Sequence, residues 1–219
     1  MSKTTLKDFL HESTWIQSDD ISAEEAVEMI KERGKEWEKF IGGYKNDNLN
    51  WLIYRGMMVR FSPDICVKYP RENRRPLTTE PKVQELADSY FKHRFGIKFR
   101  AESVFASRSK DLAKAYGDVY AIFPLDRVNF AWSPKVEDFT YEAHYFNTLL
   151  KDKDEVTDYE FKKFEEFMDD KEYRHNDDSL VKEFTKFREY KRHEIMIKCD
   201  EYIAVRENAI PKVLNLLLA

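Results

Sequence analysis

The chain has 219 residues, of which 42% are hydrophobic and 36% are charged, so it can bury the core of one large domain. Its formal net charge of −4 excludes a general electrostatic attraction to nucleic acid, although it leaves room for a local basic patch. Two cysteines are too few for a disulfide framework, and neither a membrane-spanning run nor a signal peptide can be recognised. We therefore expect a protein of a reducing, intracellular compartment.

The first 45 residues predict helices. Residues 3–16 are typical of a short helix, and a longer one is expected from Ser22 to the pair Gly42-Gly43. Ser22 followed by Glu25 forms a capping-box pattern at the start of the longer helix. The apolar stripe along this helix consists of Ala26, Ile30, Trp37 and Ile41.

The next part of the chain alternates between strand and helix patterns. Residues 50–61 (NWLIYRGMMVRF) are rich in β-formers, whereas residues 62–81 hold four prolines and predict a long loop. A helix is expected from Pro81 to Gly96. The stretch VFASRSKDLAKAYG then changes from strand to helix, with Ser107 as the expected N-cap.

The second half predicts strands on either side of a helical region. Residues 118–126 (DVYAIFPLD) indicate an interior strand and residues 128–134 (VNFAWSP) another. Residues 140–190 are rich in Lys, Glu and Asp and carry phenylalanines at helical spacing, which predicts an amphipathic helical insertion. These phenylalanines are Phe161, Phe164, Phe167, Phe184 and Phe187. Residues 193–205 (HEIMIKCDEYIAV) return to strand character, and residues 208–219 form a short apolar segment.

Arg55 is the residue that the strand pattern leaves unexplained. It stands inside an apolar run, and arginine is rarely buried without a partner. Either it lies on an edge strand with its head group in water, or it points into a pocket that holds an anion. Glu194 raises the same choice, since a carboxylate at the start of a strand is commonly exposed.

Three short motifs, in this order, resemble those of ADP-ribosyltransferases of the Arg–Ser–Glu type, particularly the small enzymes of tailed phages. Tyr54-Arg55-Gly56 matches the arginine motif of the first core strand. VFASRSKDLAKAYG, with Ser107, stands where the family has a strand end before a helix. Glu194, followed by Ile-Met-Ile, matches the glutamate that opens a late core strand. The resemblance covers residues 50–122 and 191–205.

The resemblance implies an α+β fold with the family's split mixed sheet, in a single domain of residues 1–219. Residues 1–45 would be N-terminal helices, residues 46–139 and 191–219 the ADP-ribosyltransferase-like core, and residues 140–190 the helical insertion. It also implies NAD as the donor of ADP-ribose, a host protein or nucleic acid as acceptor or target, no membrane, and action in the host cytoplasm.

The resemblance further implies roles for individual residues. Arg55, next to Gly56, would hold a phosphate of NAD, since a guanidinium forks two hydrogen bonds to phosphate. Ser107 would order the site, and Glu194 would stabilise the positive charge that develops on the ribose. A tyrosine would stack on the nicotinamide ring. The candidates for that tyrosine are Tyr116 and Tyr120.

The chain departs from the family pattern at two places. Phe105-Ala106-Ser107 replaces Ser-Thr-Ser, and Arg192 stands two residues before Glu194, where the family has the Glu or Gln that positions the acceptor. Arginine stays protonated near neutral pH and cannot act as a base. Three alternatives stay open: NAD hydrolysis, transfer to an unusual acceptor such as a nucleic-acid base or phosphate, and a binding protein of the same fold that counteracts a host defence factor such as an ADP-ribosylating toxin.

Other candidate residues lie in a basic loop and beside Glu194. The loop contains Arg71, Arg74 and Arg75, which form either a solvated surface or, like Arg192, a contact to the acceptor or partner. His193 suits acid–base chemistry, but adjacent residues of a strand point to opposite faces. The sequence has no His/Cys/Asp cluster at metal-ligand spacing and no glycine-rich phosphate loop.

Overall fold

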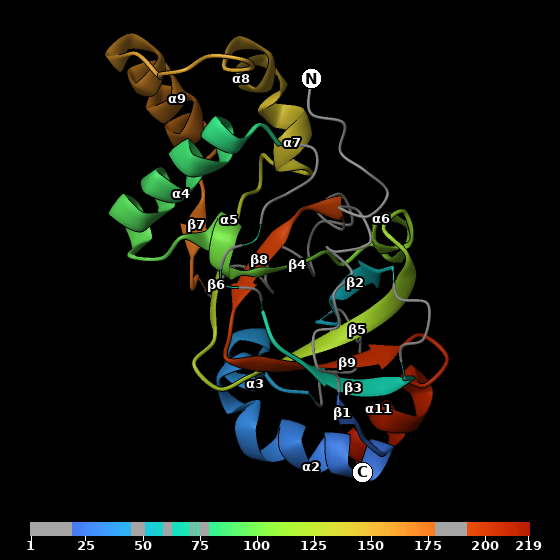
Figure 1. Cartoon of the computed structure of the whole chain (residues 1–219). Helices are drawn as coiled ribbons and strands as arrows, with labels where there is room; N and C mark the ends of the chain where they lie inside the picture. Colours follow the sequence, from blue (N-terminus) through green and yellow to red (C-terminus); the bar gives the residue numbers. More distant parts are fainter. Residues whose placement is uncertain are drawn as a thin grey trace.

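The computed structural model describes residues 19–44, 51–58, 63–70, 72, 74, 79–177 and 192–219. Several expectations fall outside these ranges: the helix over 3–16, the phenylalanines Phe184 and Phe187, and the loop residues Arg71 and Arg75. The rest of the chain combines helices with two β-sheets (Figure 1), which confirms the α+β class.

The larger sheet holds five strands of the described part, in the order β1-β3-β9-β5-β2. Their bounds are Asp19–Asp20 (β1), Tyr54–Met57 (β2), Ile65–Lys68 (β3), Asp118–Leu125 (β5) and Glu201–Arg206 (β9). Strand β5 is an interior strand, as its apolar sequence predicts. Strand β3 corrects the expectation of a loop over residues 62–81: the short run Ile65-Cys66-Val67 is buried between β1 and β9, and it outweighs the prolines on either side.

The smaller sheet, again counted over the described ranges, has the order β4-β8-β6-β7. Its strands are Val104–Ala106 (β4), Ile195–Lys198 (β8), Asn129–Trp132 (β6) and Arg174–His175 (β7). Every ladder between described strands in both sheets is antiparallel. The expected mixed sheet is therefore wrong for this part of the chain, and the strand pattern held no signal that would have settled strand direction.

The N-terminal helices are α2 (Ala23–Arg33) and α3 (Lys35–Ile41). The capping box of Ser22 and Glu25 is confirmed, because each side chain accepts a hydrogen bond from the backbone of the other residue. The single long helix is interrupted at Gly34, where a Cβ would stand 2.5 Å from the Ile30 carbonyl oxygen and 2.7 Å from the Tyr44 hydroxyl. Gly42 ends α3 in the left-handed conformation, as expected.

The other helices are α4 (Pro81–Phe95), α5 (Phe99–Glu102), α6 (Lys110–Lys114), α7 (Phe139–Glu142), α8 (His144–Leu149), α9 (Asp158–Asp170) and α11 (Ile210–Leu218). Helix α4 begins at Pro81 and ends at Gly96, as predicted. The cap of α6 is Ser109 rather than Ser107, since the Ser109 hydroxyl accepts the hydrogen bond of the Leu112 amide. The apolar segment at residues 208–219 forms α11.

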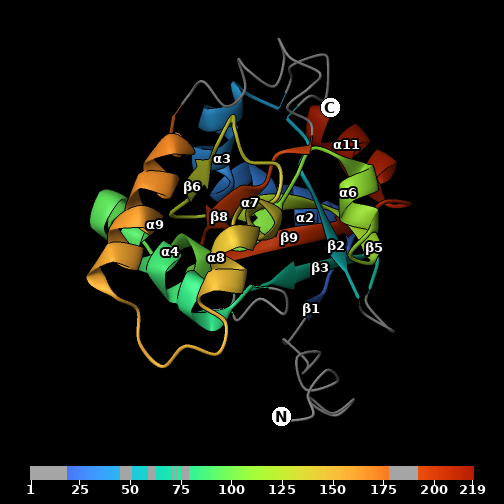
Figure 2. The ribbon, with the colours of Figure 1, turned by 90° about the horizontal axis from the view of Figure 1, so that it is seen from above.

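Two hydrophobic cores share the smaller sheet. The first lies among the larger sheet, α2, α3 and α11, and the second beneath α4, α7, α8 and α9. Strand β8 contributes to both, because Ile195 and Ile197 join the first core and Met196 joins the second. In Figure 1 the helices α4, α8 and α9 gather at the top of the molecule, while α2 lies at the bottom; Figure 2 shows the molecule from above, from the side of these three helices.

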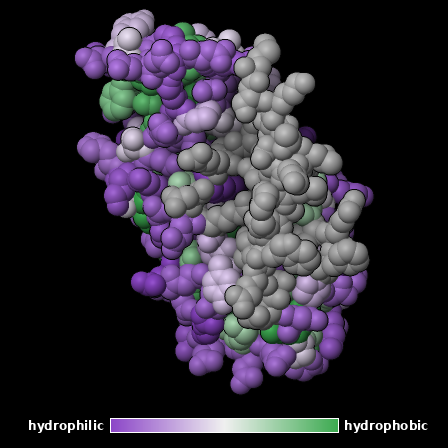
Figure 3. Space-filling view, viewed as in Figure 1, coloured by the Kyte–Doolittle hydropathy of each residue, from purple (hydrophilic) through white to green (hydrophobic). Residues whose placement is uncertain are grey.

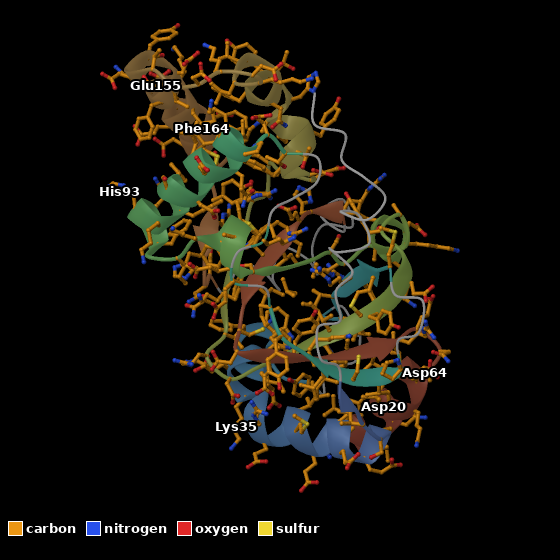
Figure 4. The ribbon with its side chains drawn as sticks, in the orientation of Figure 1. Asp20, Lys35, Asp64, His93, Glu155 and Phe164 are labelled. Carbon is orange, nitrogen blue, oxygen red and sulfur yellow. The ribbon has the colours of Figure 1, made fainter. Side chains whose placement is uncertain are left out.

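The described part of the expected insertion is helical, with the short strand β7 after α9. Phe164 is buried in the second core, and Figure 4 shows it at the end of the molecule away from Lys35 and Asp20. Phe161 lies on the exposed side of α9 instead, with 41% of its surface accessible. Figure 3 shows mostly hydrophilic residues over this end. None of the described helices is long and apolar enough to cross a membrane.

Candidate active site

Arg55 lies on β2, the edge strand of the larger sheet, opposite Tyr120 of β5. Its head group does not turn into solvent. Nη1 donates a hydrogen bond to the Phe105 carbonyl oxygen at 3.2 Å, and Nε is buried without a hydrogen-bond partner among the described residues. The edge-strand position of Arg55 is therefore confirmed, whereas a pocket that holds an anion beside it stays a prediction.

The two sheets join beside Arg55. Tyr54 and Ser107 form an isolated antiparallel bridge, with N–O distances of 2.6 and 2.9 Å between their backbones. The bridge sets β2 next to β4, and the side chain of Arg55 makes a second link between these strands through Phe105. Figure 1 shows β2, β4 and β8 close together near the middle of the molecule.

Glu194 reaches the same junction from the other side. Strand β4 pairs with β8 so that Ala106 lies opposite Ile195. Ser107 directly follows Ala106 and Glu194 directly precedes Ile195, so both residues flank the last pair of this ladder. Ser107 also bridges to Tyr54 of β2, the strand that carries Arg55.

Ser107 is nearly inaccessible and makes a local hydrogen bond. Its hydroxyl accepts from the Ser109 amide at 3.2 Å, so it stabilises the turn that leads into α6. Because the Ser107 backbone bridges to Tyr54, this turn holds the end of β4 against β2. An ordering role of Ser107 agrees with this position.

Gly56 allows α6 to pack directly on β2. A Cβ at Gly56 would stand 1.9 Å from the Ala113 carbonyl oxygen and 2.8 Å from the Tyr116 Cβ. Gly117 has a φ of +128°, and a Cβ there would lie 2.5 Å from the backbone of Met57. The protein's own residues, at and just after α6, therefore occupy the space beside Gly56, and none is left there for a ligand.

Glu194 is paired with Arg100, a residue of α5 that sequence reasoning missed. The Arg100 Nη1 donates to Glu194 Oε1 at 2.7 Å, and the two side chains are 2% and 18% exposed. Burial raises the pKa of the Glu194 carboxyl, and the positive charge of Arg100 opposes that rise. Nothing local in the sequence marks Arg100, because its partner is 94 positions away.

Asp138 and Tyr116 stand at the outer side of this junction. The Tyr116 hydroxyl donates to Asp138 Oδ2 at 3.2 Å, and the Asp138 charge raises the pKa of Glu194. Tyr116 is 56% exposed, whereas Tyr120 is completely buried. Of the two candidate stacking residues, only Tyr116 presents an accessible ring.

A pocket of about 430 Å³ lies beside α7. It is lined by residues of the turn before α7, by α7 itself and by His193, whose Nε2 lies 3.0 Å from the Pro134 carbonyl oxygen. Its charged lining is mostly acidic, with Glu137, Asp138 and Glu142 beside Lys135, and Glu194 and Arg55 are not among the lining residues.

Of the remaining predicted residues, Arg192 is peripheral and Arg74 is not. Arg192 is exposed, with its Nε 3.9 Å from Glu137 Oε2. Arg74 places its guanidinium 3.8 Å from the centre of the Phe105 ring, and its charge lowers the pKa of Glu194. Of the basic loop, Arg74 alone is described, and it lies beside the junction rather than on a distant surface.

No group of described His, Cys, Asp or Glu residues could hold a metal ion. No family model matches the chain, and no curated protein or solved structure matches it either. The function of the site is therefore argued from its residues.

Proposed function

We propose that the chain is an ADP-ribosyltransferase of phage type, which transfers ADP-ribose from NAD to a host macromolecule or to water. One observation supports this proposal above others. Arg55 on β2, Ser107 directly after β4 and Glu194 directly before β8, chosen from the sequence as one constellation, stand on segments that meet where the two sheets join.

The residues present fit NAD in two respects. Arg55 uses Nη1 for the Phe105 carbonyl and its Nε is buried, which leaves the Nη2 group as the donor for a phosphate oxygen. Tyr116 offers the exposed ring on which a flat heterocycle can stack. Gly56 and Tyr120 take part through packing, because both lie against the protein itself.

NAD supplies the ADP-ribosyl group when bound: the nicotinamide–ribose bond breaks, neutral nicotinamide leaves with the bonding electrons, and an acceptor oxygen or nitrogen bonds to the ribose and loses its proton. The chain contributes charge placement, which is the principal demand of such a reaction. Ionised Glu194 stabilises the positive charge on the ribose, and Arg55 holds the phosphates that carry it.

The acceptor is inferred from Arg192. The position that would hold a Glu or Gln to orient an arginine acceptor has instead a protonated side chain, which repels a guanidinium. We therefore propose water, or a phosphate or base of a nucleic acid, as the acceptor.

A second function is favoured by the Arg100–Glu194 pair. A carboxylate that is already neutralised by a buried arginine is less able to stabilise another positive charge. This observation favours a binding protein of the same fold, without catalysis, that would counteract a host factor such as an ADP-ribosylating toxin.

Release of nicotinamide from NAD separates the two functions. The wild-type chain is incubated with labelled NAD, alone and with host lysate, and Glu194→Gln is compared with Glu201→Gln. Glu201 is a matched control, because it also opens a strand and pairs with an arginine, Arg33, at 3.0 Å in the larger sheet. We expect release by the wild type and by Glu201→Gln, and at least about a hundredfold less by Glu194→Gln. No release from folded wild type would leave the binding function.

A further inference from the structure

Arg100 is held in place from several sides. Its guanidinium carbon lies 4.2 Å from the centre of the Phe139 ring and 4.7 Å from that of Phe105. Its Nε donates to Gln84 Oε1 at 3.4 Å. An arginine packed between two rings in this way has little freedom to rotate away from Glu194.

The Gln84 end of the network is anchored on α4. Gln84 Nε2 donates to Asp88 Oδ2 at 3.0 Å, and Asp88 Oδ1 accepts from the Ala101 amide at 3.0 Å. Gln84, Asp88 and Arg100 are all buried. The chain from Asp88 to Glu194 therefore connects α4, α5 and β8 through buried polar groups, each of which has a partner.

The pair engages one oxygen of Glu194. Oε1 accepts the Arg100 hydrogen bond, whereas Oε2 makes none with the described residues, and the side chain keeps 18% of its surface accessible. A buried ion pair is weak support for stability, since desolvation offsets much of its attraction. A pair that engages only Oε1 is better explained if Oε2 has another partner to hold.

We propose that Arg100 is a positioning residue for Glu194, which fixes Oε1 by its hydrogen bond so that Oε2 faces the ribose 2′-hydroxyl. This inference rests on the proposed function. It also answers the objection that the pair neutralises the glutamate, because Arg100 opposes the rise in pKa that burial causes at Glu194 and so favours the ionised carboxylate.

Several charges act on Glu194, and each belongs to a different part of the fold. Arg100 of α5 and Arg74 lower its pKa, and Asp138, before α7, raises it. Tyr116, after α6, and Tyr173, after α9, interact electrostatically with it as neutral phenols at neutral pH. Arg100 has the largest influence of the charged groups, and it is the one that donates a hydrogen bond.

The test measures the pKa of the Glu194 carboxyl directly and the release of nicotinamide from NAD separately. The full chain is labelled with ¹³C at glutamate carboxyls, the Glu194 signal is assigned with Glu194→Gln, and its pKa is followed in wild type, Arg100→Met and Arg100→Lys. Nicotinamide release is recorded against pH for the same proteins. Arg94→Met is the control, because Arg94 forms an exposed pair with Asp169.

We expect Arg100→Met to raise the Glu194 pKa by about one to three pH units. The acidic limb of the pH–rate profile should shift to higher pH by the same amount. Arg100→Lys keeps the charge but loses the planar donor, so it should leave the limb near its wild-type place and lower kcat by about tenfold. Arg94→Met should change neither. If Arg100→Met fails to fold, the Arg100→Lys result decides.

The outcomes distinguish the inference from the function on which it rests. NAD cleavage with the same Glu194 pKa and the same acidic limb in wild type and Arg100→Met would overturn the role of Arg100 and leave the function standing. An undiminished kcat in Arg100→Lys would do the same. Absence of cleavage in folded wild type at every pH would overturn both.

Discussion

Arg55 illustrates how one charged side chain can belong to an edge strand and still be withdrawn from solvent. Its strand ends the larger sheet, and its head group crosses to the Phe105 carbonyl of the smaller one. The apolar run around Arg55 predicts burial of its stem, whereas the acceptor of its hydrogen bond depends on a strand 50 positions away. The sequence thus indicates that Arg55 needs a partner without indicating which one.

Gly56 and Gly43 are glycines for different reasons: Gly56 lies in close contact with another segment, and Gly43 only has a positive φ. Replacing each by alanine tests this difference. Gly56→Ala should cost about 3 kcal/mol of unfolding free energy, because its Cβ would meet the Ala113 carbonyl at 1.9 Å. Gly43→Ala should cost about 1 kcal/mol, because nothing lies within 4 Å and only its φ of +95° is unfavourable. Urea unfolding at pH 7 measures both. A smaller loss at Gly56 than at Gly43 would contradict the packing of α6 on β2.

At the scale of elements, residues 193–205 have the pattern of strand residues throughout, but they form β8 of the smaller sheet and β9 of the larger sheet. β8 ends at Lys198 and β9 begins at Glu201, and between them Asp200 accepts hydrogen bonds from Arg127 at 2.8 and 3.0 Å. The turn therefore sends successive strands to different sheets. Alternation of apolar residues predicts that the strands exist, but it carries no information on which partner each strand finds.

Helix α9 depends on a capping box in which the acid also binds a lysine. Glu160 accepts hydrogen bonds from the Thr157 amide and hydroxyl and pairs with Lys153, and these contacts lower its pKa to about 2. A depressed pKa means stability that is present above the ordinary value of 4.5 and lost as the pH falls through 2.

Glu160→Gln should therefore be less stable than wild type at pH 7, and the difference should shrink as the pH falls from 4.5 towards 2. Urea unfolding at pH 7, 4 and 3 measures this difference in the free energy of unfolding. Glu155→Gln, which removes an exposed charge just before the helix, is the control and should show little change at pH 7. A Glu160→Gln difference that stays constant with pH would show that the lost contact is not that of the ionised carboxylate.

For the whole molecule, most of the described strands and helices could be predicted from local patterns, and their assembly could not. The capping box at Ser22, the ends of α4 at Pro81 and Gly96, and the interior strand β5 follow from residues within one turn or one strand. The strand β3, the antiparallel direction of the ladders and the Arg100–Glu194 pair depend on contacts between distant segments. The constellation of Arg55, Ser107 and Glu194 lies between these cases, because the resemblance supplied its members, whereas the β4–β8 ladder and the bridge from Ser107 to Tyr54 place their segments at the junction of the sheets.

The central claim is that Arg55 at this junction binds the phosphates of NAD, and calorimetric titration tests it most directly, without the acceptor. Wild type, Arg55→Lys and Arg206→Lys are titrated with NAD after circular dichroism has shown each to be folded. Arg206 is matched to Arg55, since both lie opposite Tyr120 in the larger sheet, one on each side. We predict saturable binding by wild type and Arg206→Lys, and at least about tenfold weaker binding by Arg55→Lys. Absence of binding by wild type, or equal binding by Arg55→Lys, would contradict the account.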